Sequence, residues 1–181
     1  YMVMMLSQKA DEFVDAGIED FVGKVYVLAV GARNEGSGRD SQAQAACRAG
    51  ASFGVAPGFD PQVVKAAAGM DFLFVPGVST ASEMSQALSL GCLFQKFFPA
   101  EAAGGVRMLK SLLAAFRHTG VRIMPTGGIN AGNIGSWLEI PEVAACGGSW
   151  ICESPLIEAG DWEEIGRRTR EALKALKADA L

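Results

Sequence analysis

One lysine in an otherwise apolar run is the most conspicuous candidate for chemistry in this chain. Lys96 lies in LFQKFFPAE (93–101), which is typical of a buried strand, and lysine is rarely buried without a partner. Side chains alternate along a strand, so Phe94, Lys96 and Phe98 would share one face. Burial between aromatic rings disfavours the charged amine and lowers its pKa. A neutral amine can condense with a ketone to a Schiff base, whose protonated imine stabilises a neighbouring carbanion.

Two structural roles for Lys96 fit the same spacing equally well. The ammonium group could extend to the end of the strand and reach water, or it could pair with Glu101. The residues alone leave Lys96 open between a nucleophile and a structural lysine. The other lysines fall in expected helices or turns and are expected to be solvated: Lys9, Lys24, Lys65, Lys110, Lys174 and Lys177.

Two glycine pairs suggest an anion site. Gly127 and Gly128 lie in PTGGIN (125–130), and GGSW (147–150) follows the next apolar run. Consecutive glycines after a strand let backbone N–H groups approach an anion, and a following helix N-terminus adds a positive dipole. Either pair alone is most simply a tight turn. Two pairs on adjacent strands, with the Ser149 hydroxyl beside the second, predict phosphate binding.

These residues must be positioned by alternating strands and helices. Short apolar runs are followed by Gly-, Pro-, Ser- or Thr-rich loops and then by amphipathic stretches, which predicts parallel βαβ units and an α/β fold. The unusual residues follow the runs, and sites in parallel α/β folds lie at the carboxyl ends of strands. The predicted strands are 25–30, 52–57, 72–77, 93–99, 122–128 and 143–149. The predicted helices are 41–50, 61–69, 80–91, 104–120, 130–140 and 161–176.

The first residues add a candidate seventh strand. YMVMML (1–6) is apolar and precedes a possible helix over 7–17. Seven units are one short of a closed eight-stranded barrel, and a doubly wound open sheet accommodates seven or fewer, so the pattern alone leaves both architectures open. Without a linker or low-complexity tract, residues 1–181 are expected to form a single domain.

Composition excludes several classes of function. Half of the residues are hydrophobic and a fifth are charged, as in ordinary globular proteins, and the net charge of −4 comes without the basic stripe of a nucleic-acid binder. No apolar run reaches the roughly 18 residues of a membrane span. Four scattered cysteines without a CxxC pair indicate buried thiols in a reducing cytoplasm. His118 is the one histidine and is expected to be solvated near a helix end, which argues against a catalytic metal site.

Several motifs together resemble one enzyme family. LFQKFFPAEAAGG, PGVST, PTGGIN and GGSW occur in the order and at the spacing of the 2-keto-3-deoxy-6-phosphogluconate (KDPG) and 4-hydroxy-2-oxoglutarate (KHG) aldolases. The resemblance extends from about Ala51 to the C-terminus. It implies a (β/α)8 barrel acting as a metal-free, cofactor-free class I aldolase of the Entner–Doudoroff pathway. Such an enzyme is expected to be a cytoplasmic homotrimer that cleaves KDPG to pyruvate and glyceraldehyde 3-phosphate, and KHG as a further possibility.

The resemblance also implies site residues, by position in its motifs. Lys96 would form the Schiff base with a keto-acid phosphate substrate, Pro57 and Phe98 would line the pyruvyl pocket, and Thr126 would lie near the substrate hydroxyl. The phosphate would be held by Gly127, Gly128, Gly148 and Ser149.

The first fifty residues depart from the family pattern. The family carries a motif like EVTLRT here, whose glutamate is the general acid/base and whose arginine holds the substrate carboxylate, and this sequence has no such motif. The sequence is truncated or misread, which is the favoured explanation, or Glu35 and Arg33 serve instead. Alternatively the protein is a non-catalytic phosphate-ligand-binding barrel, or another phosphate-binding barrel enzyme such as a thiamine-phosphate synthase relative. The latter needs an Asp pair for Mg²⁺, which is not evident.

Overall fold

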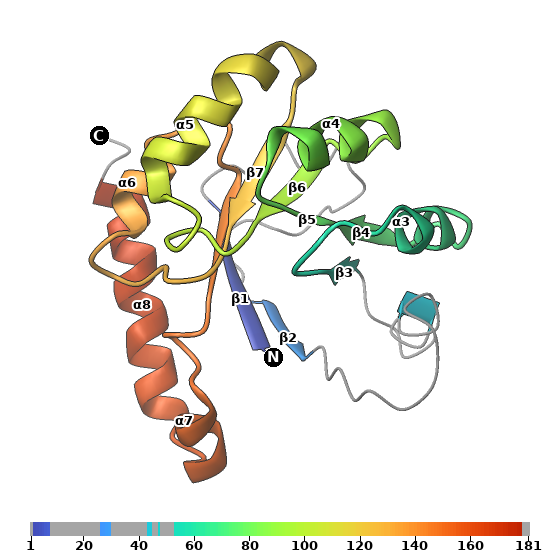
Figure 1. Cartoon of the computed structure of the whole chain (residues 1–181). Helices are drawn as coiled ribbons and strands as arrows, with labels where there is room; N and C mark the ends of the chain where they lie inside the picture. The colour runs from blue at the N-terminus through green and yellow to red at the C-terminus, as the bar shows by residue number, and fades with distance from the viewer. Residues whose placement is uncertain (1, 8–25, 30–42, 45–46, 48–52, 179–181) are drawn as a thin grey trace.

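The computed structural model describes residues 2–7, 26–29, 43–44, 47 and 53–178 of the chain (Figure 1). The strands are β1 (Met2–Ser7), β2 (Tyr26–Ala29), β3 (Phe53–Val55), β4 (Leu73–Val75), β5 (Gly77–Val78), β6 (Phe94–Phe97), β7 (Arg122–Pro125) and β8 (Ala145–Gly148). The helices are α3 (Pro61–Ala68), α4 (Ala81–Ser89), α5 (Gly105–Phe116), α6 (Ile134–Leu138), α7 (Ser154–Ala159) and α8 (Trp162–Ala178), with a 3₁₀ turn over Arg117–Thr119.

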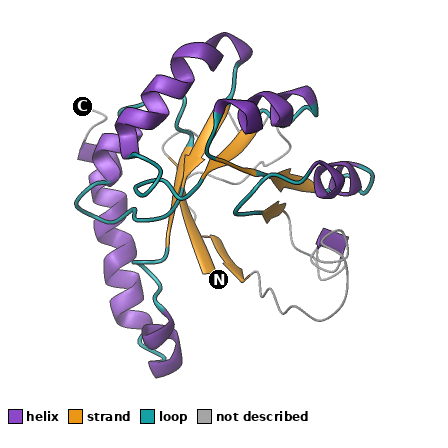
Figure 2. Cartoon of the chain, viewed as in Figure 1, coloured by secondary structure: helices purple, strands orange, loops and turns teal. Residues whose placement is uncertain are grey.

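From β3 onward the chain is a succession of parallel strands with helices outside them (Figure 2). β3 pairs with β4, and β5, β6 and β7 form a second parallel sheet. Pro76 separates β4 from β5 because proline has no N–H for the ladder, although its carbonyl accepts the Lys96 N–H at 2.8 Å. Parallel bridges Ile123–Val143 and Thr126–Gly147 join β7 to the β8 region. The predicted βαβ units are therefore confirmed in this part of the chain.

Two apolar clusters lie on the two faces of these strands. Phe97 and Ile123 belong to the cluster that faces the helices, where the fully buried Trp137 of α6 packs 6.2 Å from Phe97 between ring centroids. Met124 and Val75 belong to the second cluster, on the opposite face, against which Phe94 also packs. Alternation along β6 and β7 thus sends neighbouring residues to different clusters.

Local signals explain where the helices begin and end. Thr80 caps α4 through a capping box, because its hydroxyl accepts the Glu83 N–H while the Glu83 carboxylate accepts the Thr80 N–H. Asp60 caps α3, whose first residue is Pro61. In α5 the buried residues Leu109, Leu112 and Leu113 recur at helical spacing. His118 lies exposed in the 3₁₀ turn after α5, as predicted.

The amino-terminal strand differs from its predicted role. Residues 2–7 do form a strand, but β1 runs antiparallel to both β2 and β8 and lies between them, instead of opening a parallel unit. An edge strand such as β8 leaves N–H and C=O groups free for any extended segment, and β1 supplies the pairing in the antiparallel direction. The described strands consequently form three sheets and do not close into a barrel.

Other differences are small. The short helix α7 was not predicted, although Pro155 near its start and the left-handed Gly160 at its end are helix-boundary signals. The helix expected over 41–50 is described only at Ala43, Gln44 and Cys47, which are helical, and the one over 7–17 falls mainly on residues that the structure does not describe. The four cysteines are free thiols, and no described helix is long and apolar enough to cross a bilayer.

Candidate active site

Lys96 lies in the middle of the parallel sheet, on the face opposite the helices. Its neighbours across the ladder are Gly77 on β5 and Met124 on β7. Only 5% of Lys96 is exposed, and its Nζ lies 4.6 Å from the centroid of the Phe98 ring. The adjacent Gln95 points to the helix side, where its Nε2 donates to the Cys92 carbonyl at 2.9 Å. The predicted sharing of one face by Phe94, Lys96 and Phe98 is consistent with this geometry.

Burial changes the acidity of the Lys96 amine. Loss of hydration lowers its pKa from 10.5 to about 8, because the charged form is less stable away from water. Among the described residues no carboxylate forms an ion pair with Nζ. The Glu101 carboxylate, considered above as a partner, instead accepts hydrogen bonds from Trp137 Nε1 at 2.9 Å and Asn133 Nδ2 at 3.2 Å. The geometry therefore favours the nucleophile over the paired structural lysine.

The segments around Pro57 and Phe98 lie beside the lysine. The Gly77 N–H donates to the Gly58 carbonyl at 3.1 Å, and a Cβ on Gly77 would lie 2.3 Å from the Pro57 carbonyl carbon. Glycine at 77 thus lets the Pro57–Gly58 segment pack onto the strand that pairs with Lys96. Phe98 follows β6 directly, and its N–H donates to the Val78 carbonyl at 3.1 Å. Phe98 therefore lies beside the amine, and Pro57 lies against Gly77, the residue that pairs with Lys96 across the ladder.

Thr126 lies where three strands end. Its N–H donates to the Phe97 carbonyl at 3.0 Å, and it bridges to Gly147 at β8. The side chain is 6% exposed, and its Oγ1 has no hydrogen-bond partner within the described ranges. A buried hydroxyl without a partner is costly, and such a group is often completed by a bound molecule. Thr126 therefore has a hydroxyl group without a hydrogen-bond partner among the described residues, at the end of the strands.

The two glycine loops are adjacent in space. A Cβ on Gly148 would lie 3.3 Å from the Ile129 carbonyl oxygen, in the loop after β7. Gly127 and Gly128 have φ values of +100° and +83°, a region that favours glycine. No acceptor for the N–H groups of Gly128 and Ser149 is found in the part of the chain that the structure describes.

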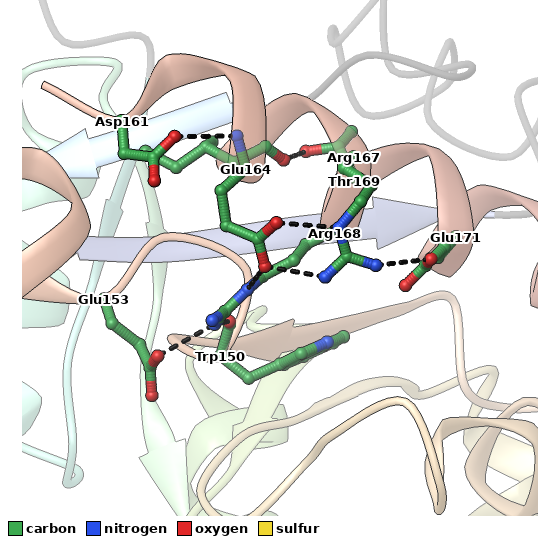
Figure 3. A network of polar contacts seen from close by, with 9 residues as sticks. Trp150, Glu153, Asp161, Glu164, Arg167, Arg168, Thr169 and Glu171 are labelled. Carbon is green, nitrogen blue, oxygen red and sulfur yellow. Dashed lines mark hydrogen bonds and ion pairs between the residues drawn. The ribbon is translucent and has the colours of Figure 1, made fainter.

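The loop over residues 147–150 is hydrogen-bonded to the carboxyl-terminal helix α8 (Figure 3). Arg168 of α8 donates from Nη1 to the Trp150 carbonyl at 2.6 Å and pairs with Glu153 at 2.8 Å. The Trp150 ring in turn covers Gly148, where a Cβ would lie 2.0 Å from Cζ3. A residue larger than glycine at 148 would therefore displace the indole. Within the described ranges, no three His, Cys, Asp or Glu side chains group to hold a metal.

Some site residues were predicted and others were missed. Lys96, Pro57, Phe98, Thr126 and the four loop residues lie at one end of the parallel strands, but Glu35 and Arg33 lie outside the described residues. Sequence reasoning missed the contact of Glu101 with Asn133 and Trp137. Asn133 is the N-cap residue of the short helix α6, and Trp137 is a buried residue within it. Neither position indicates by itself which carboxylate the side chain contacts.

Comparison with known proteins gives one consistent family. A protein-family model described as KDPG and KHG aldolase matches residues 26–168. A Haemophilus influenzae protein named 2-dehydro-3-deoxy-phosphogluconate aldolase is 46% identical over 128 residues, which cover 71% of this chain and 59% of that protein. The chain spans about three fifths of the length of the curated relatives it matches.

Solved structures give the same result. A KDPG aldolase from Legionella pneumophila, described with pyruvate captured as a covalent carbinolamine intermediate, is 36% identical, with a TM-score of 0.69 over 75% of this chain and 64% of that one. A Zymomonas mobilis KDPG aldolase structure with 3-phosphoglycerate is also 36% identical, with a TM-score of 0.67 over 74% and 61%. The fold class is thus the (β/α)8 fold of these enzymes, with an atypical amino-terminal part. The chain belongs to the KDPG and KHG aldolase family.

Proposed function

We propose that this protein is a class I aldolase in which Lys96 forms a Schiff base with a 2-keto-3-deoxy sugar-acid phosphate. The observation that carries the proposal is the burial of the Lys96 amine among apolar side chains, which lowers its pKa to about 8. An appreciable fraction of the amine is then neutral near physiological pH and able to attack a carbonyl. The covalent pyruvate adduct named for the Legionella enzyme supports this assignment.

The reaction proceeds in balanced steps. The Lys96 nitrogen adds to the C2 carbonyl carbon of KDPG, and the resulting carbinolamine loses water to give a protonated imine. Removal of the C4 hydroxyl proton breaks the C3–C4 bond, releasing glyceraldehyde 3-phosphate, and the electron pair passes into the imine to form an enamine. Protonation of the enamine at C3 and addition of water then release pyruvate and the amine. KHG, which lacks the phosphate, is a possible further substrate.

The remaining groups are assigned by what their positions allow. Pro57 and Phe98 line the pyruvyl end, and the unpartnered Thr126 hydroxyl donates to a substrate oxygen. The phosphate binds the adjacent backbone of Gly127, Gly128 and Gly148 together with Ser149. Glu35 as proton carrier and Arg33 as carboxylate ligand stay predictions. Because general acid/base catalysis contributes about 10²–10⁴-fold, a chain without the family glutamate should be slow.

The assembly and location are proposed from the expectation that the family resemblance gives. We propose a homotrimer of single-domain chains in the cytoplasm, a compartment that suits the four free cysteines. Light scattering coupled to size exclusion checks the trimer, which requires three times the mass of one chain. A monomer at micromolar concentration would contradict it.

Borohydride reduction in the presence of pyruvate tests the mechanism. The wild-type protein should acquire a stable pyruvyl adduct that peptide mass mapping locates on Lys96, and Lys96→Ala should acquire none. Lys65→Ala, which removes an exposed lysine of α3, is the matched control and should retain the adduct. An adduct on another lysine, or one that survives Lys96→Ala, would overturn the mechanism. Phosphate-ester binding without any adduct would instead support a non-catalytic binding barrel.

A further inference from the structure

Glu101 lies five residues after the proposed Schiff-base lysine, and its carboxylate is hydrogen-bonded to other residues. Its Oε1 accepts two hydrogen bonds, from Trp137 Nε1 at 2.9 Å and from Asn133 Nδ2 at 3.2 Å. Both donors belong to the segment that follows the Gly127–Gly128 turn. The carboxylate therefore connects the end of the β6 segment to the start of α6.

The contact with Trp137 provides a hydrogen-bond acceptor for a donor in the core. Trp137 is fully buried and packs against Phe97 of β6. An indole N–H in such surroundings needs an acceptor, and Glu101 is the acceptor found for it in the described structure. The side chain of Glu101 is consequently held in one direction by a rigid part of the protein.

The contact with Asn133 reaches the glycine turn. Asn133 Nδ2 also donates to the Gly128 carbonyl at 2.9 Å, and its Oδ1 accepts the Asn130 N–H at 2.8 Å. Because one side-chain amide serves both Glu101 and Gly128, the position of the carboxylate determines where Asn133 holds the turn. The Glu101 N–H adds a direct bond to the Gly127 carbonyl at 3.0 Å.

Packing acts on the same turn from the other side. A Cβ on Gly128 would lie 2.7 Å from both Cβ and Cγ of Glu101, so the backbone of the turn rests against the methylene groups of the glutamate. With φ values of +100° and +83°, Gly127 and Gly128 take a conformation that their own backbone does not prefer over others. The surrounding contacts must select it.

We propose that Glu101 is a positioning residue that holds the Gly127–Gly128 turn in the geometry that binds the substrate phosphate. The inference rests on the proposed function, because it takes the turn to be part of the phosphate site. Glu101 acts through Asn133 and Trp137 and does not touch the substrate. Its acceptor oxygen is what the role requires, so glutamine, which keeps that oxygen and loses the charge, should largely replace it.

Two measurements on each variant separate phosphate binding from Schiff-base formation. Calorimetric titration with 3-phosphoglycerate reports on the phosphate site, and borohydride trapping of pyruvate, which has no phosphate, reports on Lys96. Loss of a charge-assisted hydrogen bond that orders the turn should weaken 3-phosphoglycerate binding by about tenfold in Glu101→Ala. Glu101→Gln should stay within about threefold of wild type, and pyruvate trapping should change by less than about twofold in both.

A partner variant and a control complete the experiment. Asn133→Ala should weaken 3-phosphoglycerate binding in the same way, and the double variant with Glu101→Ala should lose little more than either single variant, because the two act in one path. Asn133→Ala also keeps the test informative if Glu101→Ala does not fold. Glu139→Ala removes an exposed carboxylate at the end of α6 that has no side-chain hydrogen bond in the described structure, and should bind like wild type.

The outcomes distinguish the inference from the function on which it rests. Wild-type protein that traps no pyruvate would refute the aldolase mechanism. Normal trapping together with unchanged 3-phosphoglycerate binding in Glu101→Ala and Asn133→Ala would overturn the positioning role alone. An equal loss of trapping and phosphate binding would also overturn it, because it would show a general structural effect. Selective loss of phosphate binding, rescued by glutamine, supports it.

Discussion

Lys96 and Arg168 are both cationic side chains near the carboxyl ends of strands, and their surroundings are opposite. Lys96 is 5% exposed, has an aromatic ring 4.6 Å from its Nζ, and forms no ion pair within the described structure. Arg168 lies on α8 and pairs with Glu153 and Glu164, the second of which it shares with Arg167 (Figure 3). Desolvation lowers the pKa of Lys96, whereas hydrogen bonds from the two arginines lower the pKa of Glu164 to about 2.

The difference shows how this fold separates reactive from structural charge. A cation that keeps water and gains partners stays charged and contributes orientation, as Arg168 does for the Trp150 carbonyl. A cation that loses water without gaining a partner is destabilised and becomes a better nucleophile. The loss of hydration at Lys96 therefore costs the folded protein stability, and it is also the source of the reactivity that we propose for this amine.

The largest effect is expected from removing the buried amine. A lysine pKa lowered from 10.5 to about 8 costs the folded state up to about 3 kcal/mol at pH 7, so Lys96→Met should raise the free energy of unfolding by roughly 1–3 kcal/mol while abolishing the pyruvate adduct. Urea denaturation measures the gain. The folded state binds fewer protons than the unfolded state between pH 8 and 10.5, so the advantage of methionine should disappear as pH rises through that window.

A surface lysine provides the contrast for this prediction. Lys65→Met replaces an exposed side chain of α3 and should change the free energy of unfolding by less than about 0.5 kcal/mol, both at pH 7 and above pH 10. Destabilisation by Lys96→Met would indicate that the amine makes a compensating contact, and the comparison with Arg168 would then fail.

The protonation of Lys96 can be followed directly. The ¹³Cε resonance of Lys96, assigned from its absence in Lys96→Met, should titrate with a midpoint near pH 8, because burial disfavours the charged form. A proton-detected carbon spectrum recorded between pH 6 and 11 gives this value. A midpoint at or above 10 would mean that the amine is hydrated or paired, and the proposed source of its reactivity would be wrong.

A smaller effect is expected at the two arginines of α8, which form a matched pair. Arg168→Gln removes the donor to the Trp150 carbonyl and should lower the thermal midpoint by about 3 °C. Arg167→Gln removes contacts to Glu164 and Glu171 within α8 alone and should lower it by about 1 °C or less. Differential scanning calorimetry measures the thermal midpoints of both variants and of the wild type. Equal shifts would show that Arg168 does no more than a surface ion pair.

The smallest effect is expected on the stability of the protein at acidic pH. Hydrogen bonds from Arg167 and Arg168 hold the pKa of Glu164 near 2, below its ordinary value of 4.5, so its contribution to stability is present above pH 4.5 and is lost as pH falls through 2. The difference in urea midpoint between wild type and Glu164→Gln should therefore persist at pH 4 and shrink towards pH 2. A difference that has already vanished at pH 4 would contradict the pairing.

Much of the fold and of the site could be predicted because both depend on local patterns. Continuous apolar runs separated by amphipathic stretches predicted β3, β4, β6, β7 and β8 with their ends displaced by at most three residues, but took β4 and the start of β5 as one strand. Alternation within β6 placed Lys96 and Gln95 on opposite faces. The antiparallel β1 could not be predicted, because strand direction is decided by which edge is free after the other strands have paired. Glu101 was considered only as a partner of Lys96, since sequence distance does not show that a helix supplies two better donors.

The sequence by itself determined the order of the strands from β3 onward, the chemical type of the proposed nucleophile and the family. Residue type, period and motif spacing are properties of the chain, and they hold before any contact between distant residues is made. Only the tertiary structure decided that the amine at position 96 loses its water, that the two glycine loops meet, and that Glu101 and Arg168 each hold one of them. These properties arise from distant segments coming together, because burial and hydrogen-bond partners depend on what packs around a residue.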